Sequence, residues 1–143
     1  MQWDNSTNAG FSLGKPWLKV NPNYVTVNVA NQETDPNSIL NYFRKMVQLR
    51  KVEPALIYGD WKLVDVDNPS VFAYTRELNG KKLLVMLNFK AVTATVDTKG
   101  LDLSKAKVLI SNQTTPSPKE SSQTVSSAQG ISLKPYEAMI LAL

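Results

Sequence analysis

The chain has 143 residues, a mass of 15.9 kDa, 43% hydrophobic residues and a net charge of +4. This is enough chain for one proper core, and the absence of cysteine and histidine excludes disulfides, Cys-bound metals and any Ser-His or Cys-His mechanism. Lysines and arginines are scattered, so we expect no nucleic-acid partner. No apolar run approaches the ~20 residues of a membrane span, so we expect no membrane partner. Because no signal peptide is recognisable, we expect a cytoplasmic protein.

The first segment, residues 1 to 34, is rich in Asn, Gly and Pro. The tripeptides GKP (14–16) and NPN (21–23) are turn signals, and only VTVNV (25–29) alternates as a strand does. An irregular stretch of this length is usually a functional loop or a piece packed on something larger. We predict an irregular loop with at most one short strand.

Residues 35 to 53 change to a helical period. Asp35 can cap the helix, Pro36 suits its first turn and Pro54 ends it. The apolar positions fall mostly on one face at helical spacing: Ile39, Leu40, Phe43, Met46, Val47 and Leu49. The pattern predicts one amphipathic helix over residues 35–53.

This apolar face needs a cover. Burial of each such side chain is worth about 1.5–3 kcal/mol, and left in water the face would be an apolar patch larger than monomers usually tolerate. The face must dock within its own chain, pair with another chain, or lose its helical structure. Of these, we expect pairing, as a homodimer through residues 35–53.

From Ala55 onward the apolar residues recur with period two, which is typical of strands. The predicted strands are ALIYGDWKLVD (55–65), VFAYTREL (71–78), KKLLVMLNF (81–89), TATVDT (93–98), AKVLIS (106–111), GISLKP (130–135) and EAMILAL (137–143). Asn79-Gly80 is a strong hairpin signal, and the nearly continuous apolar run of residues 81–89 predicts a central strand buried on both faces. Residues 113–130 are rich in Ser, Thr and Pro and predict an exposed loop with one short edge strand. Together these strands favour an antiparallel sandwich or barrel.

Few side chains suggest chemistry. Glycosidic hydrolysis needs two carboxylates across the scissile bond; Asp65 and Asp67 would share a strand face, but they enter a turn at Asn68-Pro69, so turn formation is the favoured interpretation. We predict no catalytic residue, no metal site and no cofactor in this chain.

Three aromatic residues are candidates for sugar contacts. Trp3 precedes Asp4, and such a pair can stack a sugar and hold its hydroxyls; the alternative is a Trp that anchors the loop and an Asp in an Asx-turn. Trp61, with Tyr58 close by in the sequence, can form a carbohydrate platform, although a tryptophan at such a place is more often a core or domain-interface residue.

The order of the motifs carries a resemblance. MQWDNSTNAGFSLGKPWLKVNPNY, then DPNSILNYFRKMVQLRK, then YGDW, VFAYTRE and LLVMLNF resemble the C-terminal end of the α-amylase superfamily, glycoside hydrolase family 13, in its oligo-1,6-glucosidase, α-glucosidase and sucrose-isomerase branch. The resemblance covers essentially the whole chain. Its most specific part is the opening, because family members carry RTPMQWD there and this sequence begins at that Met.

The resemblance implies a fold and a division into domains. The family has a (β/α)8 barrel followed by a C-terminal antiparallel β-sandwich. Residues 1–54 would be the tail of the barrel, made of its last loop and last helix, and residues 55–143 would be the sandwich. Since active sites of barrels lie on such loops, Gln2, Trp3 and Asp4 would lie on the rim of a glucose pocket.

The resemblance also implies a parent activity. A family 13 α-glucosidase would hydrolyse terminal α-1,6 or α-1,4 glucosidic bonds of oligosaccharides by a retaining, two-carboxylate mechanism. The family's catalytic Asp, Glu and second Asp lie in earlier barrel strands, and no position here matches them. We therefore expect a C-terminal fragment that is inactive alone and has a structural role, with the rest of the barrel as its partner; a carbohydrate-binding module is the alternative.

Overall fold

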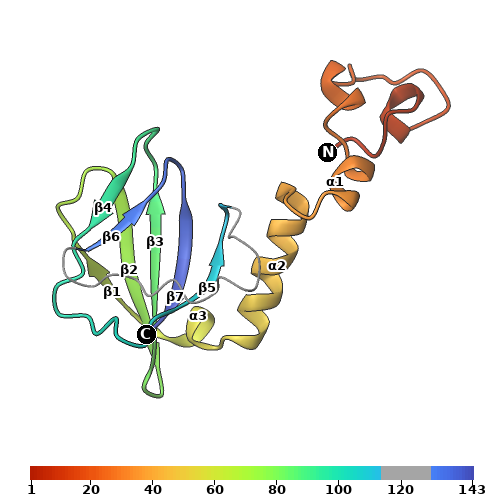
Figure 1. The fold of residues 1–143 in the computed structure, drawn as a ribbon. Helices are drawn as coiled ribbons and strands as arrows, with labels where there is room; N and C mark the ends of the chain where they lie inside the picture. Colours follow the sequence, from red (N-terminus) through yellow and green to blue (C-terminus); the bar gives the residue numbers. More distant parts are fainter. Residues whose placement is uncertain (114–129) are drawn as a thin grey trace. The chain divides into compact units, whose positions relative to one another are not determined.

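The computed structural model describes residues 1–113 and 130–143. It divides into two compact units, Met1–Gln48 and Leu49–Leu143, and each is described by itself. Figure 1 shows short helical elements in the first unit and sheets in the second. The edge strand predicted between residues 113 and 130 falls outside the described residues.

The first unit contains two 3-10 turns, η1 (Thr7–Gly10) and η2 (Pro22–Val25), then the short helix α1 (Val29–Thr34). The short strand that the sequence allowed at residues 25–29 does not form, because this stretch is the end of η2, a turn and the start of α1. Asn28 is fully buried, donates from its side chain to the carbonyl of Tyr24 at 2.8 Å and accepts from the N–H of Asn31 at 2.8 Å. These two bonds stabilise a reversal and a helix N-cap, which override the strand preference of the valines.

The predicted amphipathic helix is α2 (Ile39–Val52), and it begins later than expected. The side chain of Asp35 accepts from the N–H of Asn37 at 2.9 Å, within the turn before the helix. The hydroxyl of Ser38 instead accepts from the N–H of Asn41 at 3.1 Å, which is the N-cap bond of α2. The predicted Asp35 cap is therefore wrong, and Ser38 takes that role.

The apolar face of α2 is partly exposed, with Leu40, Met46, Val47 and Leu49 half-buried. No residue of the helix is buried, and Ile39 and Phe43 expose 79% and 64% of their surface. Polar bonds hold the helix to α1 instead: Leu40 N–H donates to the side chain of Gln32 at 3.0 Å, and the Asn41 amide donates to the Gln32 carbonyl at 2.8 Å.

A short helix, α3 (Ala55–Tyr58), precedes the first strand. The strand predicted from residue 55 is therefore wrong over its first five residues, because β1 begins at Asp60. Pro54 accepts from the N–H groups of Ile57 and Tyr58 at 2.9 and 2.8 Å, and the guanidinium of Arg76 donates to the carbonyls of Ala55 and Ile57 at 3.1 and 3.0 Å. The arginine thus gives the Ala55 carbonyl a second donor, beside the N–H of Gly59, and supplies a donor to the Ile57 carbonyl near the end of the helix.

Within the described residues, seven strands form two antiparallel sheets. They are β1 (Asp60–Val64), β2 (Val71–Leu78), β3 (Lys81–Asn88), β4 (Ala94–Val96), β5 (Lys107–Ser111), β6 (Ile131–Leu133) and β7 (Ala138–Ala142). The larger sheet has the order β1-β2-β3-β7-β5, and β4 pairs with β6 (Figure 1). The β2–β3 hairpin turns at Asn79 and Gly80, both with positive φ, as the sequence predicts.

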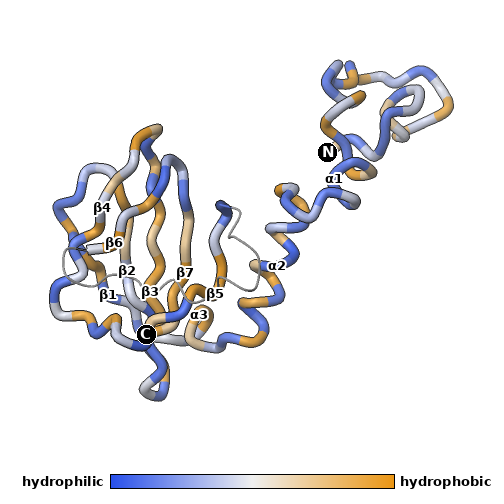
Figure 2. Tube along the Cα trace, in the orientation of Figure 1, coloured by the Kyte–Doolittle hydropathy of each residue, from blue (hydrophilic) through white to orange (hydrophobic). Residues whose placement is uncertain are grey.

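The core lies between the two sheets. Its buried residues come from β2, β3, β4, β6, β7 and the loop before β5: Val71, Ala73, Leu84, Met86, Val96, Leu103, Ile131, Leu133 and Leu141. Figure 2 shows hydrophobic residues along β3, whose Leu83, Leu84, Val85 and Met86 are all buried although they alternate between its two faces. The predicted antiparallel β-sandwich with a central β3 is confirmed.

Candidate functional site

Gln2 and Trp3 are fixed by their backbone to the start of α1. The carbonyls of Gln2 and Trp3 accept from the N–H groups of Val29 and Ala30, each at 2.9 Å. These two N–H groups have no partner inside their own helix, so the opening segment satisfies them. The Trp3 N–H donates to the Ala9 carbonyl at 3.0 Å, which closes the loop between them.

The side chains of Gln2 and Trp3 differ in their contacts. The amide of Gln2 donates to the side-chain oxygen of Asn23 at 2.6 Å and so links the opening segment to η2. The indole of Trp3 remains 56% exposed. The backbone of Trp3 therefore anchors the loop, while its ring is free to contact another molecule.

Asp4 forms an Asx-turn. Its Oδ1 accepts from the N–H of Ser6 at 2.8 Å and also from the Ser6 hydroxyl. The hydroxyl bond, followed by the backbone bond, lowers the pKa of the Asp4 carboxyl below its usual value. Asp4 is thus a carboxylate whose charge is stabilised locally.

The residues behind Asp4 have an uncommon backbone. Asn8, Ala9 and Gly10 have φ of 57°, 55° and 72°, so three successive residues are left-handed. Each of the first two costs roughly 1–2 kcal/mol relative to ordinary backbone. A Cβ at Gly10 would lie 2.8 Å from Asp4 Oδ2, so glycine permits the close approach of the carboxylate. Strain of this kind often occurs at functional sites.

A hollow of about 580 Å³ lies within the same unit. Gln2, Phe11, Trp17 and Leu18 are among the residues that line it, and Trp17 is 92% exposed. Of the three residues predicted for a substrate rim, Gln2 lines this hollow and Trp3 and Asp4 do not.

The second unit contains the other predicted sugar contact. Trp61 lies on β1, the edge strand of the larger sheet, and is 61% exposed; Tyr58 ends α3 and is 74% exposed. Asp65 belongs to the turn after β1, with a φ of 51°. Its Oδ2 accepts from the amide of Asn68 at 2.7 Å and from the N–H of Asp97 at 2.9 Å, so the turn interpretation of Asp65 is confirmed.

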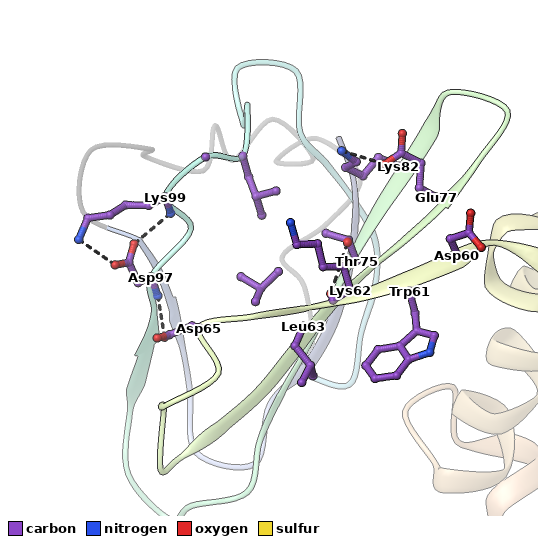
Figure 3. A pocket seen from close by; sticks show the side chains of 13 residues that line it. Asp60, Trp61, Lys62, Leu63, Asp65, Thr75, Glu77, Lys82, Asp97 and Lys99 are labelled. Carbon is purple, nitrogen blue, oxygen red and sulfur yellow. Dashed lines mark hydrogen bonds and ion pairs between the residues drawn. The ribbon is translucent and has the colours of Figure 1, made fainter.

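A second pocket of about 580 Å³ lies beside β1 and β2 (Figure 3). Its charged lining residues are Asp60, Lys62, Asp65, Glu77, Lys82, Asp97 and Lys99. Two ion pairs are present, Lys82–Glu77 at 2.9 Å and Lys99–Asp97 at 3.0 Å. The hydrogen bond from the Lys99 side chain, followed by its backbone N–H bond, lowers the pKa of Asp97, and the same side-chain bond raises the pKa of Lys99.

Two further observations concern the described residues as a whole. Within residues 1–113 and 130–143, no group of three or more acidic side chains is placed to hold a metal ion. None of the helices described there has the length and hydropathy that crossing a bilayer requires.

Comparison with family models divides the chain into two consecutive parts. The α-amylase catalytic domain matches residues 1–59, and the C-terminal domain of maltogenic amylase matches residues 61–140. The chain belongs to the α-amylase family. The resemblance seen in the sequence is therefore confirmed, and the sandwich is of the C-terminal type found in this family.

Relatives of this α-amylase-family chain include enzymes and solved structures. It is 39% identical over 98% of its length to an oligo-1,6-glucosidase of Parageobacillus thermoglucosidasius, and 33% identical over its whole length to an α-glucosidase of Schizosaccharomyces pombe. The isomaltulose synthase of Klebsiella sp. LX3 is similar with a TM-score of 0.85 and 37% identity over 99% of this chain. In each case the chain spans 24% of the relative's length.

The lysines of the second pocket were missed by sequence reasoning. Lys62, Lys82 and Lys99 come from two strands and a loop that are far apart in the sequence. Only the register, with Lys62 opposite Thr75 and Lys82 opposite Glu77, brings two of them to one face. Alternation along β1 was the one available signal, because it places Lys62 on the opposite face from Trp61.

Proposed function

We propose that the chain is the C-terminal part of an α-glucosidase that hydrolyses terminal α-1,6 or α-1,4 glucosidic bonds of oligosaccharides. Residues 1–54 would complete its catalytic barrel, residues 55–143 would be its C-terminal domain, and the catalytic carboxylates would be supplied by the rest of the barrel. The observation that carries this proposal is the consecutive match of a catalytic-domain model and a C-terminal-domain model.

In this proposal Gln2, Trp3 and Asp4 belong to the rim of the substrate pocket. Three features support the assignment: an exposed indole, a carboxylate with a lowered pKa, and a strained backbone behind both. The Asx-turn leaves Asp4 Oδ2 beside Gly10, with Oδ1 held by Ser6. Asp4 would therefore position or hydrogen-bond a sugar and would not act as a nucleophile.

The sandwich would have a structural role. By strand alternation and register, Trp61 and Leu63 of β1 lie on the same sheet face as Phe72 and Tyr74 of β2, opposite the core. Trp61, Leu63 and Phe72 are 61%, 38% and 46% exposed, and the rings of Phe72 and Tyr74 are 5.4 Å apart. A contiguous apolar face of this kind marks an interaction surface. Its partner would be the rest of the catalytic domain.

A carbohydrate-binding module is the second candidate function. The exposure of Trp61 and Tyr58 favours it, because an open indole can stack on a sugar ring. Titration of tryptophan fluorescence with maltose and isomaltose, in the wild type and in Trp61→Ala, distinguishes the two. Saturable quenching that the substitution abolishes would support binding, and an unchanged spectrum would support the structural role.

The exposed face of α2 has two proposed partners. In the complete enzyme it would be covered by the rest of the barrel; in the isolated chain we propose a dimer through residues 35–53. Sedimentation of the wild type and of a Phe43→Asp, Val47→Asp double variant tests this. A wild type that stays monomeric at high concentration, with its helix intact by circular dichroism, would rule the dimer out.

The main proposal is tested by a chimera. Residues 1–143 replace the matching segment, about a quarter of the length, of the P. thermoglucosidasius oligo-1,6-glucosidase, to which they are 39% identical over 98% of this chain. We expect the chimera to hydrolyse isomaltose and the isolated chain to show no turnover. Turnover by the isolated chain that survives repurification, or a folded chimera without activity, would contradict the proposal.

A further inference from the structure

The described residues that line the pocket beside β1 and β2 all belong to the second unit, Leu49–Leu143. Of the described strands, β4 and β6 form the smaller sheet, and each has three residues. Lys62 and Thr75 are opposite each other in the β1–β2 register, and Glu77 is opposite Asp60 on one side and Lys82 on the other. The loop from Asp97 to Leu101 lies across from them (Figure 3).

We infer that this pocket binds a neutral, polyhydroxylated ligand, such as a glucosyl unit of an oligosaccharide. Nothing in the catalytic role requires this site. The class of ligand follows from charge and hydrogen-bonding capacity, and the choice of a glucosyl unit rests on the proposed function.

The charged groups of the lining disfavour both an anionic and a cationic ligand. Four carboxylates, Asp60, Asp65, Glu77 and Asp97, accompany the three lysines, so the lining is nearly neutral, with one negative charge in excess. A phosphate or polyphosphate would bring further negative charge to four carboxylates, which like-charge repulsion disfavours. Two of the four carboxylates, Glu77 and Asp97, are already paired with lysines, so a cationic ligand would have to compete with those ammonium groups.

The paired groups still offer donors and acceptors. A carboxylate has about four acceptor sites and an ammonium has three N–H donors, so a single ion pair leaves capacity on both partners. Each hydroxyl of a sugar both donates and accepts, and neighbouring hydroxyls can bridge such alternating groups through charge-assisted bonds. Among the described residues, Lys62 makes none of the ion pairs, and it lies between the two that line the pocket (Figure 3).

Thr75 is an independent indication of a ligand. Its exposed fraction is 7%, and among the described residues its hydroxyl has one hydrogen-bond partner, the Lys62 carbonyl, at a long distance of 3.4 Å. A buried hydroxyl with so weak a partner can rotate to bond a ligand. Val64 and Leu101 add apolar surface to the lining, against which the C–H face of a sugar can pack. The volume, about 580 Å³, is in the range of about 300–1,000 Å³ that small-molecule sites occupy.

This site is distinct from the tryptophan platform. Trp61 and Leu63 are also among the residues that line the pocket, but their side chains extend to the other side of β1 from Lys62 (Figure 3). A sugar in the pocket would therefore leave the indole almost unaffected, and a sugar on the indole would not contact Lys62. Amide and indole signals can separate the two sites in one experiment.

The test is an isomaltose titration of the full ¹⁵N-labelled chain, followed by amide chemical shifts. We expect saturable shifts at Lys62, Thr75 and Gly100, and little change at the Trp61 indole. Lys62→Met removes the ammonium and keeps the stem, and it should weaken binding about tenfold, while Thr75→Val should weaken it about fivefold. The matched control is Lys90→Met, an exposed lysine outside the pocket, which should leave binding unchanged.

Three outcomes would overturn the inference: no local shifts at a large excess of isomaltose, shifts confined to the Trp61 indole, or binding that Lys62→Met leaves intact. Sodium pyrophosphate is the charged probe, and tighter binding of pyrophosphate than of isomaltose at the same amides would also overturn it. These results are separate from those of the chimera. An active chimera whose isolated chain binds no isomaltose contradicts only the pocket, and a binding chain with an inactive chimera contradicts only the α-glucosidase.

Discussion

In Met1–Gln48 the buried groups are small or polar, whereas in Leu49–Leu143 they are mostly large and apolar. Ala9, Asn28 and Ser38 are the buried residues described in the first unit, and side chain–backbone bonds such as those of Asn8, Asn28 and Asn41 connect its turns. The second unit buries leucines, valines, an isoleucine and a methionine between two sheets. Hydrogen bonds order the described residues of the first unit, which have no apolar core, whereas the second unit has an apolar core of its own.

This difference indicates that the first unit needs contacts with another part of the protein to be stable. Hydrophobic burial is the main favourable term in folding, and local hydrogen bonds add little net stability. In the first unit, Leu13 and Trp17 are almost fully exposed and Phe43 is 64% exposed. In the proposed complete enzyme, the rest of the barrel would cover these side chains.

Separating the two units gives the largest expected effect. We expect residues 55–143 alone to unfold cooperatively and to show dispersed amide shifts, because the core cluster lies entirely within them. A peptide of residues 1–48 should show no cooperative transition, since short helices without tertiary packing are only marginally stable in water. An unstructured spectrum for residues 55–143 would contradict both the proposed domain boundary and the contrast between the units.

Within the core, one truncation should have a large effect. Leu84 is fully buried between the sheets, so Leu84→Ala should lower the free energy of unfolding by about 2–5 kcal/mol. Its control is Ile39→Ala on α2, where 79% exposure predicts a change within about 0.5 kcal/mol. Chemical denaturation followed by circular dichroism measures both. Similar losses at the two positions would show that α2 is buried in solution.

The cap of α2 gives a smaller and more local effect. Ser38→Ala removes the acceptor for the Asn41 N–H and should cost about 1 kcal/mol of helix stability. Asp35→Ala, the control, removes only the bond to Asn37 in the preceding turn and should reduce helicity less. Helical ellipticity during thermal unfolding compares the two. A greater loss for Asp35→Ala would restore the original capping prediction.

The smallest expected effect is a pH dependence of the first unit. A bidentate hydrogen bond from Arg44 lowers the pKa of Glu33 below its ordinary 4.5. Because the folded pKa is the lower one, this pair contributes stability above pH 4.5 and loses it as the pH falls through the lowered value. NMR titration of the Glu33 carboxyl should give a pKa that returns toward 4.5 in Arg44→Gln. An equal pKa in both proteins would mean that the exposed pair does not persist in solution.

The sequence by itself determined those elements that depend on local chemistry and on strong periodicity. Asn79-Gly80 set the β2–β3 hairpin because these two residues tolerate positive φ at low cost, and the apolar run of β3 predicted a strand buried on both faces. The helical spacing from Ile39 onward predicted α2, and MQWD indicated the family. Each of these signals is complete within a few neighbouring residues.

Only the tertiary structure decided the rest. VTVNV became a turn and a helix start because Asn28 is buried and bonded on both sides, and residues 55–58 became α3 because Arg76, 21 residues beyond Ala55, reaches its carbonyl. The pocket exists because sheet register brings Lys62 to Thr75 and a distant loop brings Lys99 opposite them. Burial and pairing between distant residues can exceed the small local preferences of a few valines or leucines, and a single sequence does not reveal those pairings.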